Sequence, residues 1–446
     1  MKIKIGMVSL GCPKNLVDSE IMLGLLKNNN NYEITNNEKD ADAIIVNTCG
    51  FVESAKKESI ETILEMAEYK KERLKTLVVT GCLAQRYKDE LLKEIPEIDA
   101  VIGTGGYGDI ADVLNRAFSG EKPLELKNGD LLYLENDRLL STGKGYAYLK
   151  ISEGCDNCCT YCVIPSLRGP YRSRKIEDIL KEARSLVSQG VREIILVAQD
   201  TTRYGTDNYG RPMLVEFLKK LSEIEELFWI RLLYCYPEMI DDSLINEIAT
   251  NNKVCKYLDI PLQHASDKIL KAMNRRGTRN DIENLLSKIR ARIPGIVIRT
   301  SLIVGFPGES DEDFSILYDF VDKNKFDRLG VFTYSKEEGT AAFNMKPQID
   351  KRQKNRRYKK IMELQKQITN NLNKERIGKV YDVLVEGVAE DGIFYYGRSY
   401  QEAPDIDGTI YFTSRMPLNS GEYVGVKVIN SDNYDLTGDV FDESGQ

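Results

Sequence analysis

Three closely spaced cysteines, Cys155, Cys159 and Cys162, form a C-x-x-x-C-x-x-C pattern, which we call the central triad. Three thiolates at this spacing can hold three corners of a 4Fe-4S cube and leave the fourth iron without a protein ligand. An iron with a vacant position can bind a small molecule, here the amino and carboxylate groups of S-adenosylmethionine (SAM). The spacing therefore predicts a 4Fe-4S cluster that binds SAM.

The neighbouring Cys158 leaves one alternative ligand set open, because Cys155, Cys158 and Cys162 form a triplet with the two spacings reversed. We favour Cys159, since the spacing then resembles that of the radical-SAM superfamily, which has an aromatic residue, here Tyr161, before the last ligand. A zinc site is the second alternative. Zinc sites usually bring a fourth Cys or His close by, and this chain has one histidine.

Three further cysteines, Cys12, Cys49 and Cys82, each come directly after an apolar run, and we call them the N-terminal triad. Residues 1–125 alternate such runs with amphipathic stretches, which predicts a parallel sheet with helices on both faces. The expected strands are residues 4–10, 43–47, 76–80 and 100–102, and the expected helices are residues 17–27, 52–69, 84–92 and 109–117.

The placement of the N-terminal triad predicts a second 4Fe-4S cluster. Open parallel sheets bind ligands outside the carboxyl ends of their strands, where successive loops converge on one crevice. Cys12, Cys49 and Cys82 can therefore meet, although they lie far apart in the sequence. The alternative is that they are three small hydrophobic thiols at strand ends.

Residues 145–335 contain longer strand-helix units, which predict a partial (β/α)6 barrel of the TIM type. The expected strands are residues 146–151, 193–198, 229–234, 257–260, 297–304 and 329–334, and the helical runs include residues 176–188 and 311–322. The active site of such a barrel lies at the carboxyl ends of its strands. The central triad falls in the loop after the first strand, as this rule requires.

Four residues near the barrel strands are candidates for binding SAM. Gln199 and Asp200 follow the second expected strand, where they can hold the amino group of a bound methionine moiety. Gly305 ends a later strand and lets a flat adenine approach the backbone, whereas a tight strand-to-helix turn is the alternative for this glycine. Arg231 lies at a strand position that can reach the ligand. We assign no catalytic side chain beyond the cluster ligands.

Length and composition indicate a globular protein of two to four domains, with 446 residues of which 42% are hydrophobic and 29% charged. The apolar runs are too short to cross a bilayer, and the first residues are typical of a strand and not of a signal peptide. Nine cysteines without a secretion signal indicate a cytoplasmic protein with metal or redox chemistry rather than disulfides.

The net charge of -7 is unevenly distributed along the chain. Residues 377–446 hold four Lys or Arg against thirteen Asp or Glu, whereas the rest of the chain has a small positive excess. Such an acidic tail repels phosphate backbones and suits a basic partner. Its short apolar runs and glycine turns predict a small closed β-barrel of the OB type, with strands at residues 380–386, 393–398, 408–412 and 423–430.

A basic stretch precedes this tail, because seven of the ten residues 351–360 are Lys or Arg. The stretch continues into residues 361–372, which have helical spacing. We interpret it as a solvated helix that joins domains, with a contact to RNA as the alternative.

The order of these parts resembles the radical-SAM methylthiotransferases over nearly the entire chain. The parts are a cysteine-bearing N-terminal domain at residues 1–125, a radical-SAM core at residues 141–372 and a terminal TRAM module at residues 373–446. Residues 11–20, 397–400 and 403–408 are similar to the RimO branch of this family, which modifies an aspartate of ribosomal protein S twelve (uS12). The acidic tail favours the same branch, since ribosomal proteins are basic.

The resemblance implies two 4Fe-4S clusters and SAM as cofactors. At the central triad, cleavage of SAM gives a 5'-deoxyadenosyl radical, which removes hydrogen from the β-carbon of the aspartate. The cluster of the N-terminal triad delivers the sulfur, methylated by another SAM. The implied partners are uS12, attracted by the acidic TRAM module, and an electron donor such as flavodoxin or ferredoxin.

Three alternatives remain open at this point. A tRNA methylthiotransferase of the MiaB branch predicts a basic terminal module and a modified nucleoside. A non-enzymatic iron-sulfur electron carrier or scaffold predicts two clusters without cleavage of SAM. A radical enzyme whose N-terminal cysteines are only structural predicts one cluster per chain.

Overall fold

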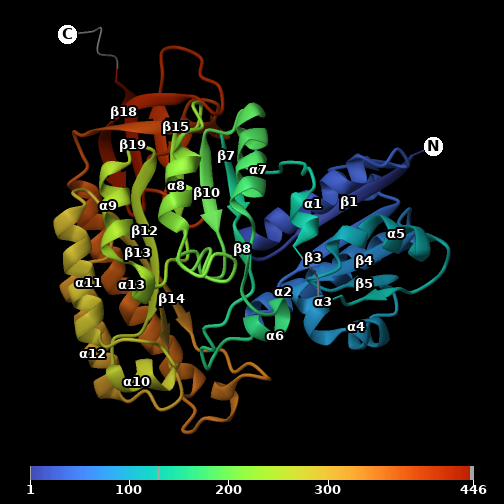
Figure 1. Ribbon diagram of the computed structural model, residues 1–446, viewed down its shortest axis with the longest axis horizontal. Coiled ribbons are helices and arrows are strands. Elements are labelled where there is room, and N and C mark those ends of the chain that lie inside the picture. Colours follow the sequence, from blue (N-terminus) through green and yellow to red (C-terminus); the bar gives the residue numbers. More distant parts are fainter. Residues whose placement is uncertain (1, 128–130, 144, 442–446) are drawn as a thin grey trace.

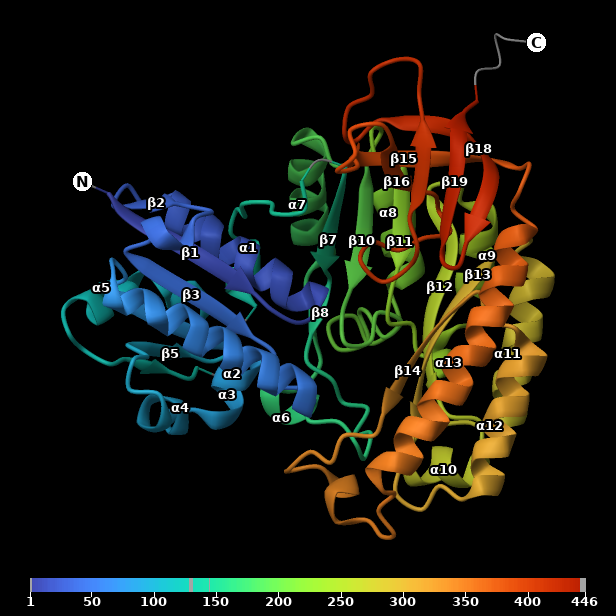
Figure 2. The same cartoon turned by 180° about the vertical axis from the view of Figure 1, so that it is seen from behind.

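The computed structural model describes residues 2–127, 131–143 and 145–441. Its helices and strands form an N-terminal sheet layer, a central half-open barrel beside it, and a small closed barrel at the carboxyl end of the chain (Figures 1 and 2). Among the acids counted in the tail, Asp442 and Glu443 lie outside the described residues. No helix in the described ranges is both long and apolar enough to pass through a membrane.

The N-terminal sheet has six parallel strands in the order β2-β1-β3-β4-β5-β6. In chain order they are β1 (Ile3–Ser9), β2 (Tyr32–Ile34), β3 (Ala43–Thr48), β4 (Thr76–Gly81), β5 (Ala100–Ile102) and β6 (Leu124–Glu125). The strand order reverses between β1 and β3, which is where such sheets bind ligands. β3 and β4 are buried along their whole length, as expected for parallel strands covered on both faces.

Helices cover both faces of this sheet, as the sequence predicted. They are α1 (Pro13–Lys27), α2 (Glu53–Glu68), α3 (Cys82–Tyr87), α4 (Asp89–Glu94) and α5 (Ile110–Phe118). α1 and α5 share one buried apolar cluster, and α2, α3 and α4 share another on the opposite face. α1 is buried nearly all round, because its far side packs against the central barrel.

The central sheet has six parallel strands in the order β14-β13-β12-β11-β10-β7 and confirms the partial (β/α)6 barrel. The strands are β7 (Tyr146–Lys150), β10 (Glu193–Val197), β11 (Trp229–Leu232), β12 (Val254–Gln263), β13 (Val297–Val304) and β14 (Arg328–Thr333). The outer helices are α7 (Ile176–Ser188), α8 (Leu214–Ser222), α9 (Asp242–Thr250), α11 (Arg279–Arg292), α12 (Asp311–Asn324) and α13 (Lys351–Lys374). One large apolar cluster fills the space between the strands and these helices.

Smaller elements surround the loops at the carboxyl ends of the barrel strands. They are β8 (Ser152–Glu153), α6 (Ile164–Arg168), β9 (Arg172–Ser173) and α10 (Asp267–Ala272). Short 3-10 helices occur at Glu38–Asp40, Tyr69–Lys71, Tyr107–Asp109, Leu132–Glu135, Pro237–Met239 and Ala341–Asn344. The central triad lies between β8 and α6, in the loop that the sequence predicted.

The carboxyl-terminal strands close into a five-stranded barrel in the order β15-β16-β17-β19-β18. They are β15 (Val380–Val388), β16 (Tyr395–Arg398), β17 (Ile410–Thr413), β18 (Tyr423–Asp432) and β19 (Asp435–Val440). The first four match the predicted strands closely. β19 was not predicted, because its residues alternate polar and apolar only weakly and a tight turn joins it directly to β18.

This terminal barrel packs against the amino ends of the central strands (Figure 2). Glu193, the first residue of β10, accepts hydrogen bonds from Arg231 and from Arg398 of the terminal barrel at 2.6 and 2.9 Å. The sole tryptophan, Trp229, contacts Tyr423 edge to face with ring centroids 4.8 Å apart. The terminal barrel therefore lies at the end of the central barrel opposite the cysteine loop.

Candidate functional site

The central triad gathers in one loop that follows β7 and β8. Cys155 donates its backbone N–H to the carbonyl of Gly169, and Cys162 donates to the carbonyl of Cys159, at 3.2 and 3.0 Å. Two of the sulfurs accept backbone N–H groups, from Asn157 to Cys155 at 3.5 Å and from Ile164 to Cys162 at 3.4 Å. Burial raises the pKa of Cys155 to about 11 and of Cys162 to about 12, and the neighbouring triad sulfurs add to both shifts.

The structure distinguishes Cys159 from Cys158. Cys159 is buried, and its sulfur lies 4.0 Å from the guanidinium of Arg275, which itself stacks on the ring of Tyr236. Cys158 is exposed and has a positive φ of 48°, a left-handed conformation that is uncommon for residues other than glycine. Cys159 therefore shares an enclosed site with the other two triad cysteines, and Cys158 does not.

The N-terminal triad also comes together, at the carboxyl ends of the adjacent strands β1, β3 and β4. Asn15 ties the three loops to one another. Its side-chain amide donates to the carbonyls of Leu10 and Thr48 at 3.0 and 2.9 Å, and its oxygen lies 4.0 Å from the sulfur of Cys82. The loops also approach through glycine: a Cβ on Gly11 would lie 2.8 Å from the Cβ of Cys49.

Two cations shape the electrostatics of the N-terminal triad. Burial acts to raise the pKa of Cys12, but the charges of Lys14 and Arg168 outweigh it and lower the pKa. Burial raises the pKa of Cys49 to about 12 and also raises that of Cys82. Cysteines bind iron as thiolates, so the two nearby cations favour the ligand form of this triad.

The two triads meet at the junction between the N-terminal sheet and the barrel, where α3 and α6 lie side by side (Figures 1 and 2). Cys82 packs in one buried cluster with Val163, the residue after Cys162, and with Leu167 of α6. Thr104 donates its hydroxyl to the carbonyl of Leu167 at 2.6 Å and holds α6 against the N-terminal sheet. The chain thus brings two cysteine triads from separate sheets to one interface.

A buried charge network lies behind this junction. The guanidinium of Arg168 donates to Asp18 at 3.0 Å and to Glu153 at 2.8 Å, and Lys150 contacts the same two carboxylates. Burial would raise the pKa of Glu153, but Arg168 and Lys150 hold it far below its usual value. Asp18 belongs to the N-terminal sheet and the other members to the barrel, so the network joins the two parts.

Three of the four SAM candidates lie at the cysteine end of the barrel. Asp200 accepts a hydrogen bond from Asn157 of the cysteine loop at 2.9 Å, and its burial raises its pKa. Gln199 donates to Glu153 of the charge network. Gly305 has a positive φ of 74°, and a Cβ there would overlap the side chain of Lys354, so α13 covers this glycine.

Arg231 is not brought together with these residues. Its three guanidinium nitrogens donate to Glu193 and to the carbonyls of Tyr400 and Ser399, at the amino end of the barrel. Each of the three nitrogens is thus engaged at the amino end, one by Glu193 of β10 and two by the terminal barrel. Arg231 serves the contact between the two barrels, so the expectation that it reaches SAM has no geometric support.

The donor set of each triad fits an iron-sulfur cluster. In the part of the chain that the structure describes, no three His, Cys, Asp or Glu side chains are placed to hold one metal ion. A 4Fe-4S cube binds each cysteine through a different iron, so its ligands stand further apart than those of one ion. All six triad cysteines are free thiols, which as thiolates are the soft ligands that such clusters require.

The sequence did not predict two arginines that contact the triads. Arg168 donates to the sulfur of Cys82 at 3.5 Å, and Arg275 approaches Cys159. The position of Arg168, six residues after Cys162, places it near the cysteine loop, but nothing in the sequence indicates a partner on the N-terminal sheet. Arg275 follows α10 and carries no sequence signal.

Comparison with known proteins agrees with this division of the chain. Residues 4–103 match the uncharacterized protein family UPF0004, residues 149–321 match the radical SAM superfamily, and residues 377–441 match the TRAM domain. Among solved structures, the radical SAM methyltransferase TsrM from Kitasatospora setae has a TM-score of 0.56 at 14% identity, covering 75% of this chain and 72% of that one. The radical enzyme OxsB has a TM-score of 0.51 at 13% identity, covering 83% of this chain and 56% of that one.

The fold and the central triad thus define a radical-SAM enzyme. A curated relative from Acetivibrio thermocellus is 63% identical over 100% of both chains, and one from Clostridium botulinum (strain Eklund 17B) is 54% identical over 99% of both. Both are named ribosomal protein uS12 methylthiotransferase RimO. The chain belongs to the RimO family of radical-SAM methylthiotransferases.

Proposed function

We propose that this protein replaces a hydrogen on the β-carbon of an aspartate in ribosomal protein uS12 with a methylthio group. The names of its full-length relatives support uS12 as the substrate. The observation that carries the proposal is the junction of the two triads, because Cys82 and the residue after Cys162 share one buried cluster. A reaction that joins a carbon radical to a sulfur carrier needs both groups at one place.

The cofactors in this proposal are SAM and two 4Fe-4S clusters, one on each triad. When bound, they supply a radical able to take hydrogen from an unactivated carbon, together with the sulfur that replaces it. An electron donor such as flavodoxin or ferredoxin reduces the enzyme. The chain itself contributes binding, orientation and exclusion of water.

Different residues at the cysteine end of the barrel contribute to binding and to orientation. Asp200, held by Asn157 of the cysteine loop, is placed to accept hydrogen bonds from the amino group of SAM. The positive φ of Gly305 turns the backbone after β13, where Lys354 of α13 covers it and the N–H groups of Gly305 and Phe306 donate to Glu309. Arg168 and its buried partners keep the N-terminal sheet fixed against the barrel, so that the distance between the triads is constant.

The terminal barrel, which matches the TRAM domain, is proposed to attract the basic substrate. Part of its negative charge is neutralised within the chain, since Glu402 forms ion pairs with Arg328 and Arg376. Other acids of this barrel remain exposed, namely Asp382, Glu390, Asp391, Asp405, Glu422, Asp432 and Asp439. Because this barrel lies opposite the cysteine loop, it contacts a part of uS12 remote from the modified aspartate.

Mass spectrometry tests the proposed function directly. Cells that carry this chain should contain uS12 with a methylthio-sized mass gain on one aspartate, and cells with Cys159→Ala or Cys82→Ala should not. Cys255→Ala is the matched control, because Cys255 is a buried free thiol on β12 outside both triads. A gain found on tRNA nucleosides and absent from uS12 contradicts the proposal and supports the MiaB-type activity.

A further inference from the structure

The exposed face of α13 carries a concentrated positive charge that the proposed reaction does not use. The exposed cations of its first half are Lys351, Arg352, Arg356, Lys359 and Lys360. Arg356 lies 3.9 Å from Asp311, and both side chains are mostly exposed. Within the described ranges, the other four form no ion pair. The chain as a whole has a net charge of -7, so this helix stands out from its surroundings.

The cations form a stripe along the helix. Arg352, Arg356 and Lys359 are spaced by four and three residues, and the same face continues through the exposed Glu363 to the exposed Lys366. Residues at such spacing lie on one face of a helix. With a rise of about 1.5 Å per residue, the stripe from Arg352 to Lys366 is about 21 Å long. A linear row of cations of this length matches several successive phosphates of a nucleic-acid backbone.

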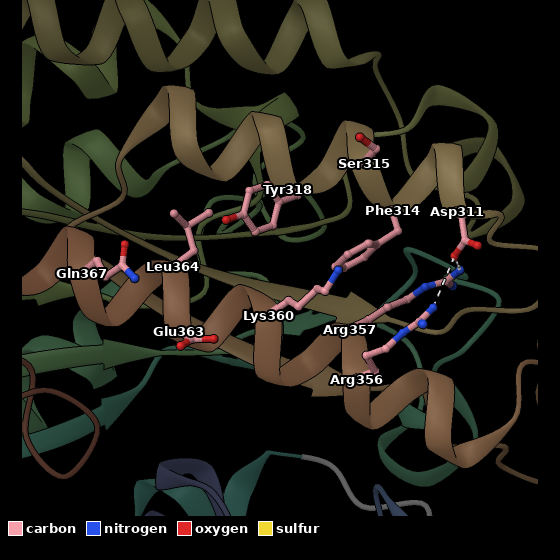
Figure 3. A pocket seen from close by; sticks show the side chains of 10 residues that line it. All are labelled: Asp311, Phe314, Ser315, Tyr318, Arg356, Arg357, Lys360, Glu363, Leu364 and Gln367. Atoms are coloured by element: carbon pink, nitrogen blue, oxygen red, sulfur yellow. Dashed lines mark hydrogen bonds and ion pairs between the residues drawn. The ribbon is translucent and has the colours of Figure 1, made fainter.

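A groove lies beside the stripe, between α12 and α13, with a volume of about 620 Å³ (Figure 3). Phe314 and Tyr318 of α12 line it together with Arg356 and Lys360 of α13. Aromatic rings next to cations are the combination that binds single-stranded nucleic acids, because bases stack on the rings while the cations hold the phosphates. The groove could therefore accommodate bases whose phosphates contact the cations of the stripe.

The acids around the stripe offset only part of its charge. Asp311 lines the groove, accepts a hydrogen bond from the buried Arg357 at 2.9 Å and lies 3.9 Å from Arg356 of the stripe. Asp350 caps the first turn of α13 by accepting from the backbone of Gln353. Glu363 is the exposed acid on the stripe itself, and Glu312 lies on α12 outside the groove lining.

The stripe begins at the end of the barrel that carries the cysteines. Lys354, in the first turns of α13, donates to the carbonyl of Tyr334, directly after β14, at 2.8 Å and covers Gly305 after β13. A ligand on the stripe would thus lie near the mouth of the site. The acidic terminal barrel lies toward the other end of α13 (Figure 2).

We propose that the exposed face of α13 binds the phosphate backbone of RNA, and that the enzyme thereby engages uS12 while it is bound to ribosomal RNA. The second part rests on the proposed function. The geometry favours RNA over an acidic protein, because a linear cation row beside an aromatic groove suits phosphates and bases together. The acidic barrel and the basic stripe then recognise the two components of one substrate, a basic protein and its RNA.

Two matched variants of the holoenzyme test the RNA contact. The stripe variant is Arg352→Gln, Lys359→Gln and Lys366→Gln on the stripe together with Lys360→Gln in the groove. The control variant is Lys181→Gln, Arg184→Gln, Lys219→Gln and Lys220→Gln, which removes the same four charges from exposed positions on α7 and α8 that form no ion pair in the described structure. Circular dichroism and iron content should be equal in all three proteins.

Fluorescence anisotropy with a labelled oligouridylate, and competition by small-subunit ribosomal RNA, provide the affinities. The stripe variant should bind at least about tenfold more weakly at moderate salt, and its plot of log Kd against log salt should lose about three units of slope, as for four lost phosphate contacts. The control variant should change less than about twofold. Equal RNA binding by both variants overturns the proposal. The proposal is also overturned if the stripe variant keeps RNA binding but can no longer be reduced by an acidic flavodoxin.

Activity assays separate this inference from the proposed function. The stripe variant should methylthiolate isolated uS12 at the wild-type rate and uS12 within small ribosomal subunits more slowly. If the wild-type enzyme modifies neither form, the proposed function fails while the anisotropy result still decides the RNA contact. If the stripe variant modifies both forms at wild-type rates, the role of the stripe in substrate recognition is overturned.

Discussion

The guanidinium of Arg168, at the end of α6, lies 3.5 Å from the sulfur of Cys82, at the start of α3. Arg168 ends the helix that begins two residues after Cys162, so a single short helix links the two triads. The same guanidinium donates to Asn15, which ties the loops of the N-terminal triad to one another. Arg168 therefore connects the loop of the central triad to the N-terminal triad, and its positive charge lies beside the N-terminal cysteines.

Replacing Arg168 with Gln should lower the reduction potential of the cluster that we propose for the N-terminal triad. A nearby positive charge stabilises the more negative reduced form of a cluster, and a unit charge at this distance changes the potential by on the order of 100 mV. The measurement is an EPR-monitored redox titration in a protein whose central triad is replaced by Ala, so that one cluster is observed.

Arg275→Gln is the control for this experiment, because Arg275 approaches the central Cys159 rather than the N-terminal triad. It should leave the potential of the N-terminal cluster unchanged. If Arg168→Gln also leaves that potential unchanged, Arg168 acts only as a link between the two sheets.

The two adjacent cysteines of the central loop should respond differently to substitution. Cys159→Ala should abolish the central cluster, whereas Cys158→Gly should retain it, because Cys158 is exposed and its φ of 48° suits glycine. Iron and sulfide content of anaerobically reconstituted protein, with the N-terminal triad replaced by Ala, measures this cluster alone. Loss of iron in Cys158→Gly together with retention in Cys159→Ala would reverse the assignment.

The sequence predicted the sites whose signal is local and missed those that depend on distant contacts. The spacing of Cys155, Cys159 and Cys162 identifies the central triad without a structure, and the strand-end rule brings the N-terminal triad together. Arg168 carries no such signal, since its partner Asp18 lies 150 residues away in the sequence. β2 and β6 were not predicted because they have three and two residues and each includes a glutamate, whereas the equally short β5 is wholly apolar.

The interpretation of Arg231 shows a second reason why the sequence was insufficient. Arg231 and Asp200 both lie on or near barrel strands, and the sequence pattern alone does not tell to which end of the barrel a long side chain extends. The structure shows that the side chain of Arg231 extends toward Glu193 at the amino end, because the terminal barrel supplies two carbonyl acceptors there. The contact between the two barrels decides this direction, and it involves residues about 170 positions apart.

The contact between the barrels should weaken in acid through Glu402. Burial acts to raise the pKa of Glu402, but Arg376 and Arg328 lower it to about 2, from an ordinary value of 4.5. When the pKa of a carboxyl is lower in the folded chain than in the unfolded chain, the group stabilises the fold at pH values above its unfolded pKa. This stabilisation is lost as the pH falls toward the pKa of the folded chain. Between pH 6 and pH 3.5 the wild-type chain should lose about 1 kcal/mol from this group.

Glu402→Gln should be less stable than the wild type at pH 6, by about 3 kcal/mol, because it leaves two buried arginines without their partner. The difference between the two proteins should then shrink as the pH falls to 3.5. Urea unfolding of the cluster-free chain, followed by the fluorescence of Trp229, measures the free energy of unfolding of each protein at each pH. Trp229 is a suitable probe because this sole tryptophan packs on Tyr423 of the terminal barrel. A difference that stays constant with pH contradicts the assigned role of Glu402.

The exposed acids of the terminal barrel should determine the affinity for uS12. Neutralising Asp382, Glu390 and Asp432 to their amides removes three exposed negative charges from this barrel. Because uS12 is expected to bind through charge complementarity, its Kd should rise by about five- to tenfold at low salt, with a smaller difference at high salt. Glu90→Gln, Glu94→Gln and Glu97→Gln remove the same charge from exposed positions in and after α4, far from the terminal barrel, and should leave the Kd unchanged. Equal effects of the two triple variants would mean that net charge alone, and not the terminal barrel, attracts the substrate.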